Sequence, residues 1–373
     1  MKKIIIILYG IFLLFFSLFS YAFIDINFFY LEKLYSGITF EHRFVTTAIF
    51  TFFITVFFTF YLYWIYACVK GILTSKDIKI LVIVSCGTLL VAYPAMLSND
   101  IFNYIATAKV LFTYHENPYI IMPIEFTGDP LLKFMHAANK TALYGFVWIL
   151  LTGIPFVLGF SNIFLTLFSF KLFITIFYLL TIYYIGKITK QKLSMILFGL
   201  NPLVLIETMV SGHNDIVMMF FALVSLWVFL KRESLKGIVL LLLSIFIKYA
   251  SGILVPLYLY MYITKHYEMR KMLTLAAVSM FCIFFLSSIR EEIYPWYAIW
   301  FLIFVVLIPQ KRVLLTLSIL FSFSLLFRYI PYMFFGTYGG ITQGVKTVLT
   351  FAAPSLYLLF ILGKTLWVKV SSR

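Results

Sequence analysis

Residues 44–69, FVTTAIFTFFITVFFTFYLYWIYACV, form an apolar run that contains no charged side chain. A helix of about 20 such residues is long enough to cross the roughly 30 Å hydrocarbon core of a bilayer. Comparable runs recur along the chain, since 63% of its 373 residues are hydrophobic and only 12% are charged. Soluble domains are about half apolar and about a quarter charged. The sequence therefore predicts an all-α, polytopic membrane protein that forms a single membrane domain over residues 1–373.

The net charge of +15 is concentrated in short connections between the apolar runs. These connections hold 19 of the 29 basic residues but only three of the 14 acidic residues, and they are residues 2–3, 70–79, 187–192, 231–236, 265–271, 311–312 and 364–373. Such an asymmetry is typical of cytoplasmic connections. It predicts cytoplasmic N- and C-termini, and it accounts for the basic excess without a nucleic-acid partner.

Ten full spans are expected, at about 4–23, 44–69, 80–97, 163–186, 193–210, 216–230, 272–289, 298–309, 313–330 and 344–363. The first run resembles a signal peptide, but we expect it to stay as an uncleaved helix. The charge pattern leaves two further runs that do not cross fully. We expect 146–160 to be re-entrant or interfacial, and 237–263 to be a broken hairpin with Lys248 near its apex.

The longest polar stretch, residues 98–145, interrupts this pattern directly after a predicted span. A long loop in a compact protein is usually functional. Its first acidic residue, Asp100, has two interpretations. Together with Ser98 and Asn99 it is a good helix-capping residue. Alternatively, it is a carboxylate beside a low-dielectric wall, suited to accepting a proton from a sugar hydroxyl or to binding a divalent ion.

Several ionisable or polar residues from four separate parts of the sequence are predicted to lie on the same outer face: Asp100, His213, Asn214, Asp215, Lys248, Glu291 and Glu292. Ionisable groups at or below the membrane surface are costly and by default mark a site. Glu207 lies below this surface in the segment that precedes His213, so we expect it to have a partner.

Each of these motifs also has a simpler structural interpretation. Asn214 or Asp215 in "SGHND" (211–215) is suited to capping the next helix. Lys248 is either a snorkelling side chain or a ligand for a lipid-linked phosphate, a task for which Arg290 and Arg328 are rivals. The "YPWY" stretch at 294–297 is either an interfacial aromatic belt or a platform that stacks on a sugar ring or a lipid chain.

The sequence contains no Walker or GxGxxG phosphate loop, no HExxH and no GxSxG motif, and its cytoplasmic connections are too short for a nucleotide-binding domain. The three cysteines have no metal-ligand spacing. An activated substrate must therefore reach the site from within the membrane or from the outer side. A lipid-phosphate sugar meets both conditions.

The stretch "SNDIFNYIATAKVLFTYHENPY" (98–119) resembles a pattern of the polyprenyl-phosphate-mannose-dependent mannosyltransferases of the GT-C superfamily. "LYGFVWILL" (143–151) is similar to a Tyr-Gly-Pro-Leu-Trp stretch of that family, with Phe146 in place of the proline. "NPLVLIETMVSGHND" (201–215), "IFIKYASGILVPLYL" (245–259) and "YPWY" resemble later landmarks, including the Lys-containing helix of the GPI-mannosyltransferase-like branch.

The resemblance implies an inverting transfer of a hexose, mannose above all, from a polyprenyl- or dolichyl-phosphate sugar to a glycan or glycolipid, on the outer face of a bacterial plasma membrane. Asp100 matches the catalytic base. No second acid stands near Asp100 in the sequence, so the question of whether a metal ion is bound stays open. A transporter or flippase, or a polymerase or ligase of lipid-linked saccharides, is the alternative. The expected substrate-binding residues are Asn99, Asn103, Tyr104, Lys109, Asn117, Tyr119, His213, Asn214, Asp215, Lys248, Glu291, Trp296 and Tyr297.

Overall fold

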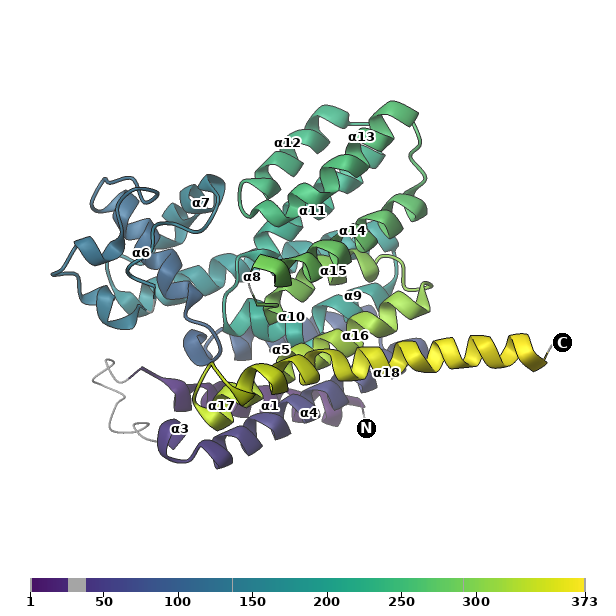
Figure 1. Cartoon of the computed structure of the whole chain (residues 1–373), viewed down its shortest axis with the longest axis horizontal. Coiled ribbons are helices and arrows are strands. Elements are labelled where there is room, and N and C mark those ends of the chain that lie inside the picture. The colour runs from purple at the N-terminus through teal and green to yellow at the C-terminus, as the bar shows by residue number, and fades with distance from the viewer. Residues whose placement is uncertain (1, 26–37, 136, 291, 372–373) are drawn as a thin grey trace.

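The computed structural model describes the whole chain except residues 1, 26–37, 136, 291 and 372–373 (Figure 1). The described residues form helices and connections, with no strand among them. The α-helices are α1 (Lys2–Ser20), α3 (Ile38–Glu41), α4 (Arg43–Val69), α5 (Ser75–Leu89), α6 (Asp100–Phe112), α7 (Phe146–Val157), α8 (Ile163–Thr189), α9 (Lys192–Gly199), α10 (Pro202–Leu205), α11 (Asp215–Leu230), α12 (Ser234–Ile245), α13 (Val255–Thr264), α14 (Met269–Arg290), α15 (Ala298–Val305), α16 (Arg312–Phe327), α17 (Ile330–Phe335) and α18 (Ile341–Ser371). The prediction of an all-α membrane protein is confirmed.

Shorter helical turns separate these elements. They are η1 (Tyr21–Phe23), η2 (Pro94–Met96), η3 (Pro123–Glu125), η4 (Pro130–Phe134), the π-helix η5 (Ile206–Val210), η6 (Tyr249–Leu254) and η7 (Pro295–Tyr297). Several of them begin at a proline, which lacks the N–H that a continuous helix needs. They break the apolar runs into pieces.

Six helices in the described chain are long and apolar enough to span a membrane, and a seventh span forms if α9 and Pro202–Val210 are joined across their 55° bend. Ten full spans were expected, because each apolar run was counted whole. Five further apolar helices, among them α7 and α11, are shorter. The 12 residues of α7 extend only about 18 Å, too short to cross a bilayer, as expected for 146–160.

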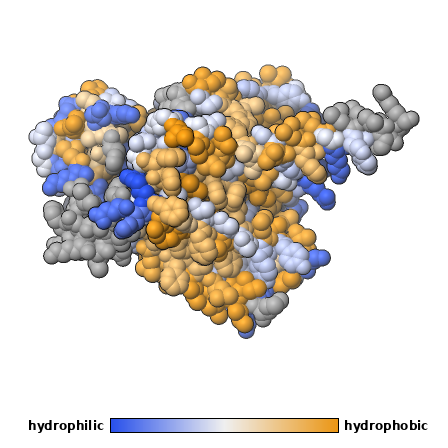
Figure 2. Space-filling model, turned by 60° about the horizontal axis from the view of Figure 1, so that its bottom comes forward, coloured by the Kyte–Doolittle hydropathy of each residue, from blue (hydrophilic) through white to orange (hydrophobic). Residues whose placement is uncertain are grey.

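Hydrophobic side chains cover most of the face shown in Figure 2, whereas hydrophilic side chains gather toward its ends. Many large apolar side chains are exposed on the long helices, including Phe52 at 62% and Ile83 at 67%. A water-facing surface would not present such a contiguous apolar area. This distribution fits a protein surrounded by lipid.

The basic connections between the first spans lie together at one end of the bundle. Lys2 forms an ion pair of 2.8 Å with Asp77, and the Lys192 ammonium donates to the Leu73 carbonyl over 3.4 Å. In Figure 1 the start of α1 and the C-terminal part of α18 point toward the same end, while α6 and its following loop lie at the other. The polar stretch 98–145 is therefore remote from the basic connections.

The helix that leads to Asp100 is shorter than expected. It begins at Ser75 because Thr74 and Asp77 form a reciprocal capping box, and it ends at Leu89 instead of residue 97. Lys171 of α8, only 2% exposed, donates from its ammonium group to the Leu89 carbonyl over 3.1 Å and to the Ala92 carbonyl. A cation is favourable at the C-terminus of a helix, where carbonyl groups lack partners. Lys171 thus stabilises the break that precedes Asp100.

A second break occurs at Lys248. The helix α12 ends at Ile245, and η6 starts immediately after Lys248 before the chain continues into α13. Both α12 and α13 pack on α11, where the Ser225 hydroxyl donates to the Gly237 carbonyl over 2.6 Å and lies 2.7 Å from the Tyr258 hydroxyl. The expected interruption of 237–263 near Lys248 is confirmed.

Candidate active site

The carboxylate of Asp100 lies at the start of α6 and contacts an imidazole from a distant part of the sequence. Its Oδ2 atom lies 3.5 Å from Nδ1 of His213. The Asp100 side chain is 29% exposed, whereas His213 is fully buried. The N-cap of α6 is Asn99, and its side chain forms no capping hydrogen bond. The Asp100 carboxylate is therefore directed at His213 rather than at the free N–H groups of its own helix.

The segment that carries His213 is shaped by a local distortion of the helix. Asn201 caps α10 through its side-chain oxygen, and the helix then widens into the π-helix η5. Gly212 adopts φ +71, a left-handed conformation that favours glycine, and the His213 N–H donates to the Glu207 carbonyl over 2.9 Å. π-helical turns are frequent at functional sites. This turn places His213 next to the side chain of Glu207.

Glu207 provides a second carboxylate beside His213. Its Oε2 atom lies 3.2 Å from His213 Nε2, and its Oε1 atom accepts a 3.0 Å hydrogen bond from the Tyr329 hydroxyl. Glu207 is fully buried, and within the described chain its partners are the Tyr329 hydrogen bond at Oε1 and the His213 ion-pair contact at Oε2. The imidazole thus lies between two carboxylates, although no second acid is near Asp100 in the sequence.

The protonation of His213, in the connection Ser211–Asn214, follows from these neighbours. Burial alone would lower the pKa of the imidazole, but the adjacent carboxylates of Asp100 and Glu207 outweigh that effect and raise the pKa to about 9. His213 is therefore a cation at neutral pH. Its single positive charge lies between the two carboxylates and keeps the Asp100 carboxylate in place.

Trp296 covers the His213 ring. The two rings stack with their centroids 3.9 Å apart and 22° between their planes, and Tyr294 stacks on Trp296 at 4.6 Å. Trp296 and Tyr297 are only 8% and 7% exposed. These two residues are therefore not a lipid-facing aromatic belt, because Trp296 packs on the imidazole and Tyr297 stacks on Trp300.

A second buried pair joins Asp215 to Lys248. The Lys248 ammonium lies 3.0 Å and 3.1 Å from the two Asp215 oxygens, and Trp300 Nε1 donates to Asp215 over 2.5 Å. The ammonium also lies 4.8 Å from the centroid of the Tyr297 ring. Lys248 therefore reaches inward to a carboxylate instead of snorkelling outward, and Asp215 balances its charge.

Tyr104 contacts Asn214, the residue between His213 and Asp215 in the sequence. Its hydroxyl donates to Asn214 Oδ1 over 3.3 Å, and its ring packs edge-on against Tyr144 and Trp148. Nearby polar atoms have no hydrogen-bond partner within the described chain, including Asn103 Oδ1 and Asn214 Nδ2. Buried polar groups normally have partners, so these atoms suit a hydroxylated ligand or water.

A comparison with protein families decides what kind of protein carries this arrangement. Residues 7–264 match the family profile described as "Alpha-(1->6)-mannopyranosyltransferase, N-terminal domain" (the MptA_B family). The chain belongs to this family. It is accordingly, in general terms, an alpha-mannosyltransferase with a membrane-embedded fold. No curated protein and no solved structure gave a significant match.

The matched region of this mannosyltransferase includes Asp100, Glu207, His213, Asp215 and Lys248. The residues that complete their environment come from beyond it: Trp296, Trp300 and Tyr329 lie in the C-terminal part. Sequence reasoning did not single out Tyr329, Trp300 or Lys171. Tyr329 and Trp300 lie in aromatic-rich apolar runs where their residue type gives no signal. Lys171 stands alone in an apolar run, where snorkelling explains it equally well.

The remaining expected site residues of the mannosyltransferase stabilise the loop after α6. Lys109 forms a 2.7 Å ion pair with Asp129, which also accepts a hydrogen bond from Tyr114. Asn117 Oδ1 accepts from the Tyr119 N–H, and the Tyr119 hydroxyl donates to the Tyr144 carbonyl. The structure does not bring Lys109, Asn117 or Tyr119 into contact with Asp100. Glu291 lies outside the described residues.

Glu292 is at the centre of a third charged cluster. It lies 3.1 Å from Arg328 Nη2 and 3.2 Å from Lys346 Nζ, and it accepts a 2.8 Å hydrogen bond from Gln343. Within the described residues, no group of three or more His, Cys, Asp or Glu side chains is arranged to hold a metal ion.

Proposed function

We propose that this protein is an inverting GT-C-type glycosyltransferase. It moves a hexose, mannose, from a polyprenyl-phosphate sugar to a hydroxyl group of a glycan or glycolipid, at the extracytoplasmic face of a bacterial plasma membrane. The observation that supports this most is the partly exposed Asp100 carboxylate held beside the buried His213 cation. The family supports mannose as the sugar, and the position of Asp100 away from the basic connections supports the outer face.

In the proposed reaction, the acceptor hydroxyl oxygen attacks the anomeric carbon of the donor sugar. The hydroxyl proton passes to the Asp100 carboxylate, the bond between the anomeric carbon and the phosphate oxygen breaks, and the lipid phosphate leaves with the electron pair. His213 keeps the Asp100 carboxylate oriented for this transfer, and Glu207 with Tyr329 holds His213. His213 and Glu207 are therefore positioning residues.

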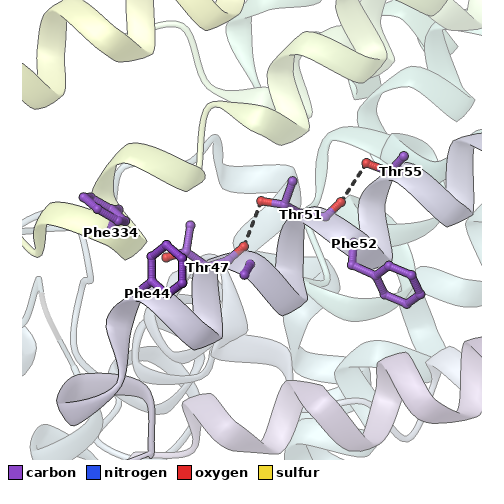
Figure 3. Close-up of a pocket in the computed structure, with 7 residues that line it drawn as sticks. Phe44, Thr47, Thr51, Phe52, Thr55 and Phe334 are labelled. Atoms are coloured by element: carbon purple, nitrogen blue, oxygen red, sulfur yellow. Dashed lines mark hydrogen bonds between the residues drawn. The ribbon is translucent and has the colours of Figure 1, made fainter.

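A groove on the membrane-facing side of α4 and α17 suits the lipid chain of the donor (Figure 3). It encloses about 570 Å³ and is lined by Phe44, Thr47, Ala48, Thr51, Phe52, Thr55 and Phe334. The threonine hydroxyls donate to carbonyl groups one turn earlier, Thr51 to Thr47 and Thr55 to Thr51 over 2.8 Å each. Because these hydroxyls are already bonded, the wall of the groove is effectively apolar.

Two donor classes distinguish this proposal from its rivals. Purified protein in lipid vesicles is given either polyprenyl-phosphate mannose or a nucleotide-activated mannose, with a glycan or glycolipid acceptor. We expect labelled product only from the lipid-linked donor. Transfer from the nucleotide sugar would contradict the donor assignment. Movement of the lipid-linked sugar across the vesicle without any product would point instead to a flippase.

A further inference from the structure

The cluster around Glu292 contains more positive than negative charge. Arg328 follows the end of α16, Lys346 lies early in α18, and Glu292 lies in the connection from α14 to η7. Both cations are nearly buried, at 9% and 6% exposed, whereas the Glu292 side chain is 32% exposed. Within the described residues of this cluster, one carboxylate thus faces two nearly buried cations.

The donors of this cluster converge on the two oxygens of one anion. Arg328 Nη2 and Lys346 Nζ both approach Glu292 Oε2, and Gln343 Nε2 approaches Oε1. Arg328 Nη1 is used separately, since it donates to the Thr350 hydroxyl. Burial alone would raise the pKa of Glu292, but the Gln343 hydrogen bond and the Lys346 and Arg328 charges outweigh it and lower the pKa. An arginine, a lysine and an amide N–H in this arrangement are suited to phosphate oxygens.

The cluster also adjoins the candidate active site and the groove. Tyr329, the residue after Arg328, donates to Glu207. The helix α17 then starts at Ile330 and carries Phe334 into the groove. By contrast, Lys248 is matched one to one by Asp215 and shares that carboxylate with Trp300. Among the described ion pairs next to the site, Arg328 and Lys346 are therefore the two cations that share a single carboxylate.

We propose that Arg328 and Lys346 form a binding site for a phosphate ester, and that Glu292 is a resident anion which the phosphate displaces. Building on the proposed function, this assigns the phosphate of the lipid donor to the C-terminal part of the chain, beyond the matched family region. Because its carboxylate is attached to the chain, Glu292 competes with the phosphate for the same two cations. It shields the two buried cations when no ligand is bound.

This arrangement predicts that removal of the competing Glu292 carboxylate strengthens phosphate binding. Farnesyl phosphate is titrated into detergent-solubilised protein, with farnesol as the uncharged control. Glu292→Gln is expected to lower the Kd for farnesyl phosphate by at least about threefold, because the competing charge is gone. Arg328→Gln and Lys346→Gln are each expected to raise it by about tenfold. The matched control is Glu233→Gln, an exposed carboxylate paired with Lys236 in another connection.

The outcomes separate the alternatives. Unchanged or weaker binding of farnesyl phosphate in a folded Glu292→Gln variant would overturn the proposal, and so would equal loss of farnesol binding in the Arg328 and Lys346 variants. We expect inorganic phosphate to compete with farnesyl phosphate for binding, and phosphatidylglycerol vesicles not to compete. Competition by the vesicles but not by inorganic phosphate would assign the cluster to a bilayer headgroup instead. Since binding is measured without turnover, the phosphate site stands or fails independently of transfer activity.

Discussion

Asp100 and His213 are more than a hundred residues apart in the sequence, yet Oδ2 of one lies 3.5 Å from Nδ1 of the other. The imidazole is fully buried and the carboxylate is partly exposed. This pair connects the buried interior of the bundle with the partly exposed start of α6. It also means that a change at Glu207, on the far side of the imidazole, must affect Asp100.

Glu207→Gln is expected to lower the pKa of His213 from about 9 toward its ordinary value of 6.5, because one of the two flanking carboxylates is lost. The raised pKa means that protonated His213 stabilises the folded protein fully below about pH 6.5, and that this contribution is lost as the pH rises through 9. The variant should lose its stability and transfer activity at lower pH than the wild type. Thermal denaturation and transfer rate, each measured from pH 6 to 10, check this. Identical alkaline limits in both proteins would contradict the assignment.

Lys171→Met is expected to reduce kcat by tenfold or more while leaving the donor KM unchanged. The substitution removes the cation that holds the Leu89 and Ala92 carbonyls, so the segment leading to Asp100 loses its fixed position. Lys171→Arg should recover part of the rate. Lys187→Met, an exposed lysine later in the same helix α8, is the control. A lower melting temperature with unchanged kcat would make Lys171 purely structural.

Ala48→Phe is expected to raise the KM for a polyprenyl-phosphate donor severalfold, because the new ring occupies the groove between α4 and α17. The same substitution at Val45, which is exposed on α4 but does not line the groove, should have no such effect. Donors with shorter prenyl chains measure the effect further. If Ala48→Phe and Val45→Phe gave the same KM, the groove would not bind the chain.

Asp215→Asn is expected to destabilise the protein by about 3 kcal/mol, because it leaves the Lys248 ammonium beside an uncharged partner in a largely buried position. The double variant Asp215→Asn, Lys248→Met should recover most of that loss. Unfolding in mixed micelles provides the comparison. Additive losses in the double variant would show that the two residues do not act as a pair.

The sequence predicted the fold class because apolar runs and charge asymmetry are local properties. It also placed Asp100, His213, Asp215, Lys248 and Glu292 on one face, and the structure brings the first two and the next two together. The number of full spans was overestimated, because prolines and a π-helix turn several runs into shorter pieces.

The partners within the site were not predictable in the same way. Glu207 contacts His213 only because the π-helix and the turn at Gly212 reverse the direction of the backbone. Tyr329 and Trp300 come from segments whose aromatic residues do not differ from the many others in this chain. Lys171 is a single lysine within an apolar helix, a pattern that snorkelling explains equally well. Such contacts depend on how the helices pack, which residue spacing does not encode.

We propose that Asp100 is the base for transfer from a lipid-phosphate sugar. The most direct measurement is transfer of labelled mannose from polyprenyl-phosphate mannose to an acceptor, comparing wild type with Asp100→Asn at equal amounts of folded protein. The substitution keeps the size and much of the hydrogen bonding of the side chain but removes its capacity as a base. We expect the rate to fall by about 10²–10⁴-fold with donor binding retained. Equal rates in the two proteins would contradict the account.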